Sequence, residues 1–226
     1  GYAPPRARSS DDGSVLGSGS PKGGAFVKKI VGALFFVAGF CAPAFAAEKA
    51  EHTGFNLGFN AGFQNVRGNF FGNDVKPGPA FKFDFGWRIV PLVSLESGLA
   101  VGTGKSEDLD ETVTFVHILN LDARYFPLGA GKLEPNVLAG WTLGSGASVE
   151  LAPDVTLTLT GYSPTLGVGT RFHVTDLAYV QGDFRYLYTR FTDVTVDSNG
   201  QSDSASLVTQ RHGDAFMVLL GAGLQF

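Results

Sequence analysis

The chain has 226 residues, of which 44% are hydrophobic and 31 are glycines, and its formal net charge is −4 at pH 7. Five of the 17 basic residues and two of the 21 acidic residues precede residue 47, so the remainder carries 12 basic and 19 acidic residues and a net charge of −7. This balance argues against nucleic acid as a partner, and a single cysteine excludes an intrachain disulfide framework.

The first 46 residues are predicted to lie outside the folded domain. Residues 1–24 are rich in glycine, serine and proline without an apolar period, which is typical of a disordered extension. Residues 25–46 combine two lysines, an apolar run and small residues at the end, which is the pattern of a signal peptide for export. We expect cleavage after Ala46 or Ala47, and we take residues 47–226 as one folded domain.

The apolar run could instead be a membrane helix that anchors a soluble domain. It covers residues 30–45, only 16 residues, whereas a spanning helix needs roughly 20, and Pro43 interrupts its end. The sequence therefore favours an exported protein whose leader is removed.

Apolar and polar residues alternate from residue 54 onward. Residues 54–64 place phenylalanine, leucine and alanine on one face and asparagine, glycine and glutamine on the other. Residues 79–89 repeat this pattern with aromatic residues opposite Lys82, Asp84 and Arg88. A period of two predicts strands with one apolar and one polar face. Six further strands are predicted at residues 92–102, 113–126, from 134, up to 173, 178–191 and 214–226.

The connections between these segments alternate in length. Short ones are expected at residues 90–91, 127–132 and 174–176, and long polar or acidic ones at residues 65–78, 103–112, 145–160 and 192–213. Eight strands of this length with alternating short and long connections predict an all-β fold, an eight-stranded antiparallel up-and-down transmembrane β-barrel. The apolar phase slips between Leu159 and Leu166, which predicts a bulge at residues 162–164.

Alternation alone also fits a soluble barrel with an apolar core and a polar exterior. The polar face of the predicted strands carries five basic and four acidic residues together with many glycines, and the export signal favours placing this face inside. The predicted interior charge network consists of Lys82, Asp84, Arg88, Glu96, Asp122, Arg124, Arg171, Asp183 and Arg185. Because isolated buried charges are costly, we expect these side chains to pair and to close the barrel.

The last strand ends on an aromatic residue and carries apolar residues at alternate positions. These residues are Phe216, Val218, Leu220, Ala222, Leu224 and Phe226. This strand resembles the C-terminal signal by which outer-membrane barrels are assembled, and residues 120–127 and 133–140 resemble strands of the OmpA/OmpX-type small barrels. The resemblance implies the outer membrane as location, membrane lipid and the barrel-assembly machinery as partners, and no periplasmic peptidoglycan-binding domain.

Enzymatic and metal chemistry find little support in the sequence. A lipid A-modifying barrel enzyme would need a serine, a histidine and a carboxylate within reach, but His117 and Ser97 are expected to point outward and form no convincing triad. Residues 197–203 resemble a calcium loop but lack its full spacing, so Asn199 is better explained as a hairpin tip. We therefore expect no catalytic residue, cofactor or metal.

The leading functional hypothesis is a non-enzymatic barrel with a structural or surface-interaction role through its long loops, whose ligand or partner the sequence does not name. A narrow, porin-like diffusion channel is the first alternative. A lipid A-modifying enzyme is the second.

Overall fold

The computed structural model describes residues 52–68, 75–106, 111–199 and 201–226. The predicted disordered N-terminal segment at 1–24 and the signal peptide at 25–46 lie outside the described residues. The strands are β1 (Gly54–Arg67), β2 (Val75–Lys76), β3 (Gly78–Val90), β4 (Val93–Ser106), β5 (Thr112–Tyr125), β6 (Leu133–Ala152), β7 (Val155–His173), β8 (Ala178–Ser198) and β9 (Gln201–Gln225). Among these described residues, no helix is long and apolar enough to cross a membrane.

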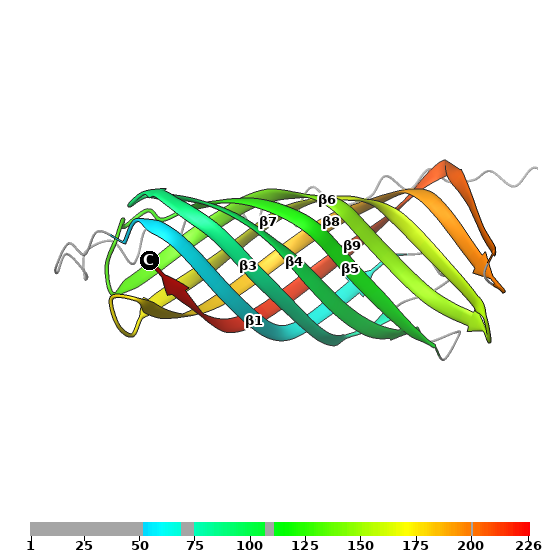
Figure 1. Cartoon of the computed structure of the whole chain (residues 1–226), viewed down its shortest axis with the longest axis horizontal. Helices are drawn as coiled ribbons and strands as arrows, with labels where there is room; N and C mark the ends of the chain where they lie inside the picture. The colour runs from blue at the N-terminus through cyan, green and yellow to red at the C-terminus, as the bar shows by residue number, and fades with distance from the viewer. Residues whose placement is uncertain (1–51, 69–74, 107–110, 200) are drawn as a thin grey trace, which may run out of the picture. The chain divides into compact units, whose positions relative to one another are not determined.

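The strands close on themselves. Each strand from β3 to β9 pairs antiparallel with its neighbour along the chain, β1 pairs with β3 on one side and with β9 on the other, and β2 adds two residues beside β4. The result is a ring of eight strands, as the sequence predicted (Figure 1). A ring leaves no strand edge unpaired, which is what a sheet needs in order to cross a lipid bilayer.

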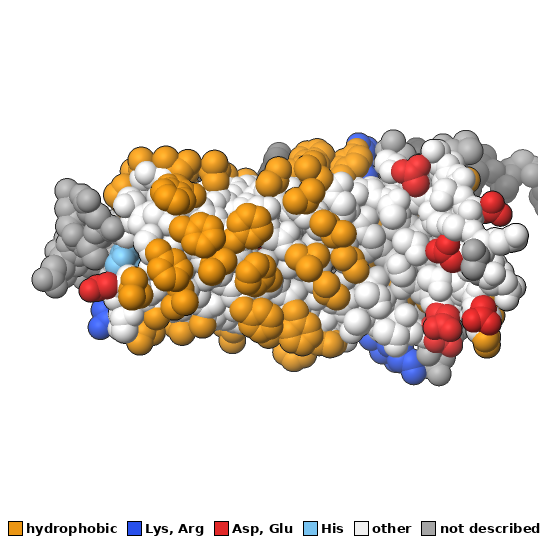
Figure 2. Space-filling view, viewed as in Figure 1, with side chains coloured by type: hydrophobic (Ala, Val, Ile, Leu, Met, Phe, Trp, Pro, Cys, Tyr) orange, Lys and Arg blue, Asp and Glu red, His pale blue; other side chains and the backbone are white. Residues whose placement is uncertain are grey.

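The outer surface carries a belt of apolar side chains (Figure 2). On β8 the outward positions run from Val180 to Tyr188, and the charged Arg190 follows. Nine residues at about 3.4 Å, tilted by about 40°, cover roughly 23 Å, close to the apolar band of outer-membrane barrels. Aromatic pairs lie towards one edge of the belt, where Tyr186 stands 5.1 Å from Phe216 between ring centres.

A bulge in β5 overturns one prediction. The register between β4 and β5 shifts at Gly98/Leu99, and Leu119 has a φ of 55°. Leu119, Leu121, Ala123 and Tyr125 face outward as expected, but the extra residue reverses the phase on its other side. His117 is therefore buried inside the barrel, and the prediction that it points outward is wrong.

A second prediction fails at residues 162–164. Ser163 and Thr165 continue the inward phase of Leu159 without a break, so β7 contains no phase slip. The irregularities at this level are extra residues in the neighbouring strands, between Thr142 and Ser145 in β6 and between Phe191 and Asp193 in β8, where the β7–β8 register shifts at Thr160/Gly161. The pattern was misleading because the inward positions of β7 themselves change from polar to apolar.

Two of the predicted long loops are hairpins rather than irregular segments. β6 and β7 remain paired up to Ala152 and Val155, and β8 and β9 up to Ser198 and Gln201. The two tips are joined, because the amide of Asn199 donates a hydrogen bond to the carbonyl of Asp154 (3.1 Å). We call these outer parts of the two hairpins the extension; it projects at the end opposite the short turns (Figure 1).

Candidate functional site

The interior of the barrel has a polar layer towards the short turns and an apolar layer towards the extension. All nine charged residues of the predicted network lie in the polar layer, and none is more than 3% exposed. Glycines on the same face make room for them: a Cβ at Gly140 or Gly169 would lie 2.1 Å from a carboxylate oxygen of Asp122 or Asp183. The small residues and the charges thus occupy one closely packed layer.

Arg124 is the centre of this layer. Its guanidinium donates two hydrogen bonds to Asp183 (2.8 and 3.0 Å), one to Asn136 (2.6 Å) and one to Glu96 (3.2 Å). Arg185 donates to Asp122 (2.5 Å) and to Asp183 (3.2 Å). Two parallel N–H···O bonds to one carboxylate are the strongest geometry available to arginine.

The same interactions continue around the barrel wall. Arg171 donates to Glu96 (2.5 Å) and to Gln181 (3.0 Å), and Gln181 donates to Asn60 (2.7 Å). Asn60 in turn donates to Asp84 (2.7 Å), which pairs with Lys82. Lys82 lies 3.8 Å from Asp122, so the interactions return to their start and form a closed circuit.

The principal ion pairs cross the interior instead of joining neighbouring strands. Arg124 on β5 reaches Asp183 on β8, and Arg171 on β7 reaches Glu96 on β4. In the ring, two strands lie between the members of each of these pairs on one side and four on the other, so the side chains reach across the interior. Eight-stranded barrels are just narrow enough for side chains to fill in this way.

A tenth charge, Glu134 on β6, is fully buried and was missed as a network member. It accepts a hydrogen bond from Arg88 (2.6 Å), whose guanidinium also lies 4.0 Å from the centre of the Phe126 ring. The inward phase of β6 could have identified Glu134, because Val137 and Ala139 face outward. With Glu134 the layer holds five basic and five acidic side chains.

Two histidines meet beside Glu134 at the short-turn end. The rings of His52 and His173 are stacked at 3.8 Å with an angle of 3° between their planes, and His173 Nε2 lies 3.2 Å from Glu134 Oε2. His52 precedes β1, and there burial followed by the neighbouring His173 lowers the pKa of its imidazole below the usual value. His52 lies before the first alternating segment of the sequence, so its contact with His173 was not predicted.

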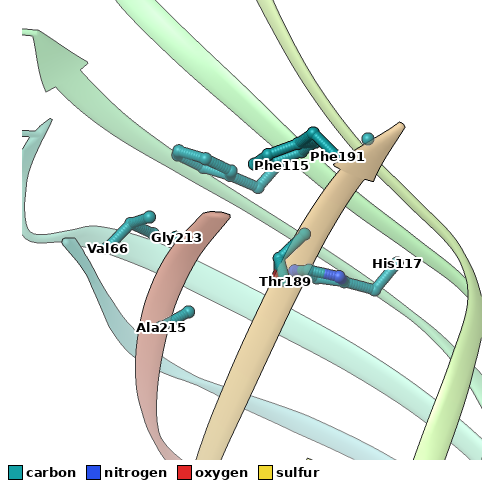
Figure 3. Close-up of a pocket in the computed structure, with 8 residues that line it drawn as sticks. Val66, Phe115, His117, Thr189, Phe191, Gly213 and Ala215 are labelled. Carbon is teal, nitrogen blue, oxygen red and sulfur yellow. The ribbon is translucent and has the colours of Figure 1, made fainter. Parts of the chain in front are cut away.

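The half of the interior nearer the extension is apolar. Its buried side chains include Phe115, Leu159, Phe191 and Met217. Figure 3 shows a small cavity in this region, between Phe115, His117, Thr189 and Phe191. Its volume of about 10 Å³ suits one water molecule and nothing larger.

His117 contacts serine at the boundary between the two layers. Its Nδ1 lies 3.1 Å from Ser145 Oγ, which is 2.6 Å from Ser163 Oγ, and Ser163 is 2.7 Å from Thr189 Oγ1. Within the described residues, no carboxylate hydrogen bonds to this imidazole, so the orienting member of a triad is not supplied there. Both His117 and Ser145 are buried, whereas Ser97, the serine considered from the sequence, is half-buried on the outer side of β4.

The outer surface of the extension is polar, and acidic residues gather on it (Figure 2), whereas inward residues such as Val149 and Leu159 belong to the apolar layer. On β8, Asp193 accepts hydrogen bonds from the hydroxyl groups of Thr192 (2.7 Å) and Ser206 (2.9 Å). These bonds favour the carboxylate and lower the pKa of Asp193 below its usual value. Residues 197–199 and 201–203 lie at the end of the β8–β9 hairpin, where Ser198 pairs with Gln201, as the hairpin interpretation expected.

The predicted assembly strand forms the closing edge of the ring. β9 pairs with β1 from Asp214 to Gln225, and Phe216, Val218, Leu220, Ala222, Leu224 and Phe226 all occupy its outward phase. Leu220 is 70% exposed and Phe226 60%, so these apolar side chains contribute to the outer belt. The amide of Phe226 donates to the carbonyl of Phe55 (2.8 Å) and fixes the end of the chain beside the start of β1.

Comparisons with known proteins agree with this architecture. A family model described as outer membrane protein beta-barrel domain matches residues 32–226. The fold is similar to that of neisserial surface protein A, with a TM-score of 0.57 and 16% identity over 76% of this chain and 97% of that one. It is also similar to OprG of Pseudomonas aeruginosa (TM-score 0.52, 13% identity, 79% and 99% covered) and to a major outer membrane protein of Thermus thermophilus (TM-score 0.55, 16% identity, 77% and 99% covered). No curated protein sequence matches the chain.

Proposed function

Since the chain belongs to the family of outer-membrane β-barrel proteins, and is thus a protein of the bacterial outer membrane, we propose that it is a non-enzymatic barrel with a closed interior and an extension for contact outside the cell. The observation that carries the proposal is the charged layer, in which arginines with no exposed surface hold carboxylates of non-neighbouring strands across the interior.

The ion pairs support closure for an energetic reason. A solute or hydrated ion passing through the interior would have to separate Arg124 from Asp183 and Arg171 from Glu96. Removing one partner of a buried pair costs about 3–5 kcal/mol, which shows how unfavourable it is to leave such a charge without the other. The apolar layer adds a second obstacle, because the small cavity lined by Phe115 and Phe191 has the volume of one water molecule.

The extension supports the second half of the proposal. Outer-membrane barrels have short turns on the periplasmic side and long connections on the cell surface. By this rule the hairpins β6–β7 and β8–β9 face the exterior, and they end well beyond the apolar belt (Figure 2). The tips are joined through Asn199 and Asp154, so they offer one continuous polar surface rather than independent loops.

Closure is tested by conductance in planar bilayers. The purified barrel should give no stepwise conductance, whereas Arg124→Ala, which removes the central crossing side chain, should give openings. A control variant, Arg190→Ala, changes an exposed arginine on the outer side of β8 and should behave as the unmodified protein. Stable single-channel steps from the unmodified barrel would establish the diffusion-channel alternative instead.

Orientation is tested by labelling intact cells. The expected mature chain contains no cysteine, so single cysteines can be introduced at Asp197 in the extension and at Asp176 in a short turn. A membrane-impermeant maleimide should modify the cysteine at position 197 and not the one at position 176. The opposite result would place the extension in the periplasm and exclude its role at the cell surface.

A further inference from the structure

The short-turn end of the barrel holds a cluster of metal-ligating side chains from three distant parts of the chain. His52 precedes β1, Glu134 is the second residue of β6, and His173 is the last residue of β7. One possible ligand atom from each residue lies within 4.8 Å of the others, and all three side chains are buried. We infer that His52, Glu134 and His173 form a binding site for a divalent transition-metal ion, for which Zn²⁺ is the best-matched probe.

The distances are close to those of a coordinated metal. Zinc bonds of about 2.0–2.2 Å in a tetrahedral site separate the ligand atoms by about 3.3–3.5 Å. His173 Nε2 and Glu134 Oε2 are already 3.2 Å apart. The remaining ligand atom lies no more than 4.8 Å away. The His52 and His173 rings are stacked in parallel, so the His52 ring has to turn out of this stack before its nitrogen points at the same ion and completes three corners of a tetrahedron.

His173 provides the second observation that points to a ligand. Its side chain is 5% exposed, and neither ring nitrogen makes a well-aligned hydrogen bond among the described residues, although Nε2 lies 3.2 Å from Glu134 Oε2. A buried polar group without a hydrogen bond costs about 1–3 kcal/mol. Coordination through one nitrogen would compensate for this cost.

The carboxylate of Glu134 is already oriented by its neighbours. Gly131 donates its amide to Oε1 (3.1 Å), and Arg88 donates to Oε2 (2.6 Å). Each oxygen accepts two bonds, so Oε2 keeps one lone pair for a metal while Arg88 fixes its direction. Partners of this kind hold ligands in place in natural metal sites.

The ligand set also selects the metal. Two imidazoles and one carboxylate suit zinc, nickel or copper, whereas magnesium and calcium prefer sites made of oxygen ligands alone. A bound ion would connect the segment before β1 to the short-turn end of the barrel, because His52 precedes the strands whereas Glu134 and His173 lie in β6 and β7. Metal binding would thus stabilise the folded state.

The test uses the barrel without a histidine tag, refolded in detergent and treated with a chelator to remove metal ions. Titration calorimetry with Zn²⁺ should show one ion per chain, and His52→Ala and His173→Ala should each weaken binding at least about 100-fold, since even loss of a supporting residue costs 10–100-fold. Millimolar Mg²⁺ should not compete. Thermal unfolding provides a second readout: Zn²⁺ should raise the midpoint of the unmodified barrel and leave that of His52→Ala unchanged.

His212→Ala is the matched control, because this histidine is exposed on β9 and lies against Tyr188. Its affinity for Zn²⁺ should equal that of the unmodified barrel. His52→Ala leaves every strand residue in place, so loss of binding there is not explained by loss of the ladder. Equal zinc binding by the unmodified protein and His52→Ala, or no binding by either, would overturn the inference.

Discussion

Replacing Arg124 by alanine should destabilise the barrel by about 3 kcal/mol. The side chain has no exposed surface and makes four hydrogen bonds, to Asp183, Glu96 and Asn136. Removing one partner of a buried ion pair typically costs about 3–5 kcal/mol, because the other charge is left without compensation. The lower end applies here, since Asp183 keeps Arg185 (3.2 Å) and Glu96 keeps Arg171 (2.5 Å).

Urea unfolding in lipid vesicles, followed by tryptophan fluorescence, measures this loss. The midpoint should fall while the slope stays unchanged, because the same surface is exposed on unfolding. Arg124→Ala combined with Asp183→Asn should cost less than the two single changes together, since the double variant buries no unpaired carboxylate at position 183. A midpoint for Arg124→Ala equal to that of the exposed control Arg190→Ala would refute the buried-pair argument.

Three further predictions concern the outer belt, the extension and the end of the chain. Phe83→Arg should lower the free energy of unfolding in vesicles by about 2–4 kcal/mol. Bromolipids in the bilayer should quench a fluorophore at position 83 but not one at Lys82. Stronger quenching at position 82 would mean that the apolar side chains face the interior of the barrel. Asp193 should stabilise the extension at pH values above its unfolded pKa of about 3.9, and this stabilisation should be lost as the pH falls through its lower folded pKa. Ser206→Ala should raise the folded pKa of Asp193 in an NMR titration, and an unchanged pKa would contradict the hydrogen-bond argument. Phe226→Ala should reduce the amount of barrel assembled in cells while leaving vesicle stability nearly unchanged, and normal assembly would rule out its role as a signal.

The fold was predictable because one physical constraint acts on every strand. Because lipid surrounds the barrel and polar or charged side chains fill it, apolar and polar residues alternate along each strand. Residues 54–64 and 79–89 show this alternation without interruption. The extension was not recognised, since its inward face carries small and aliphatic residues such as Ala147, Val149 and Leu159 while its outward face is polar, and polar outward positions were taken as the sign of a loop. The predicted outward orientation of His117 was wrong because a bulge at Leu119 adds one residue to β5, and alternation alone does not reveal such an insertion.

The candidate site was predictable only in part for a similar reason. Phase assigns a residue to the inside or outside of its own strand, so it was enough to predict inward positions for the nine charges, which are buried, and Glu134 could have been added. Which charges meet across the barrel depends on strand tilt and stagger, which a single strand does not contain. His52 precedes any periodic segment, so nothing in the sequence links it to His173.

The closed circuit of interior charges has a consequence for how the barrel is made. Its members come from β1, β3, β4, β5, β7 and β8, and Arg124 contacts Asp183 only when the sheet is curved enough for β5 and β8 to face each other across the interior. A curved sheet that has not yet joined β9 to β1 would leave guanidinium and carboxylate groups facing hydrocarbon without their partners. Partly closed intermediates are therefore unfavourable, and membrane insertion and closure of the barrel should occur together as one cooperative event. The last contacts to form are the twelve β1–β9 residue pairs from Asn56–Gln225 to Arg67–Asp214.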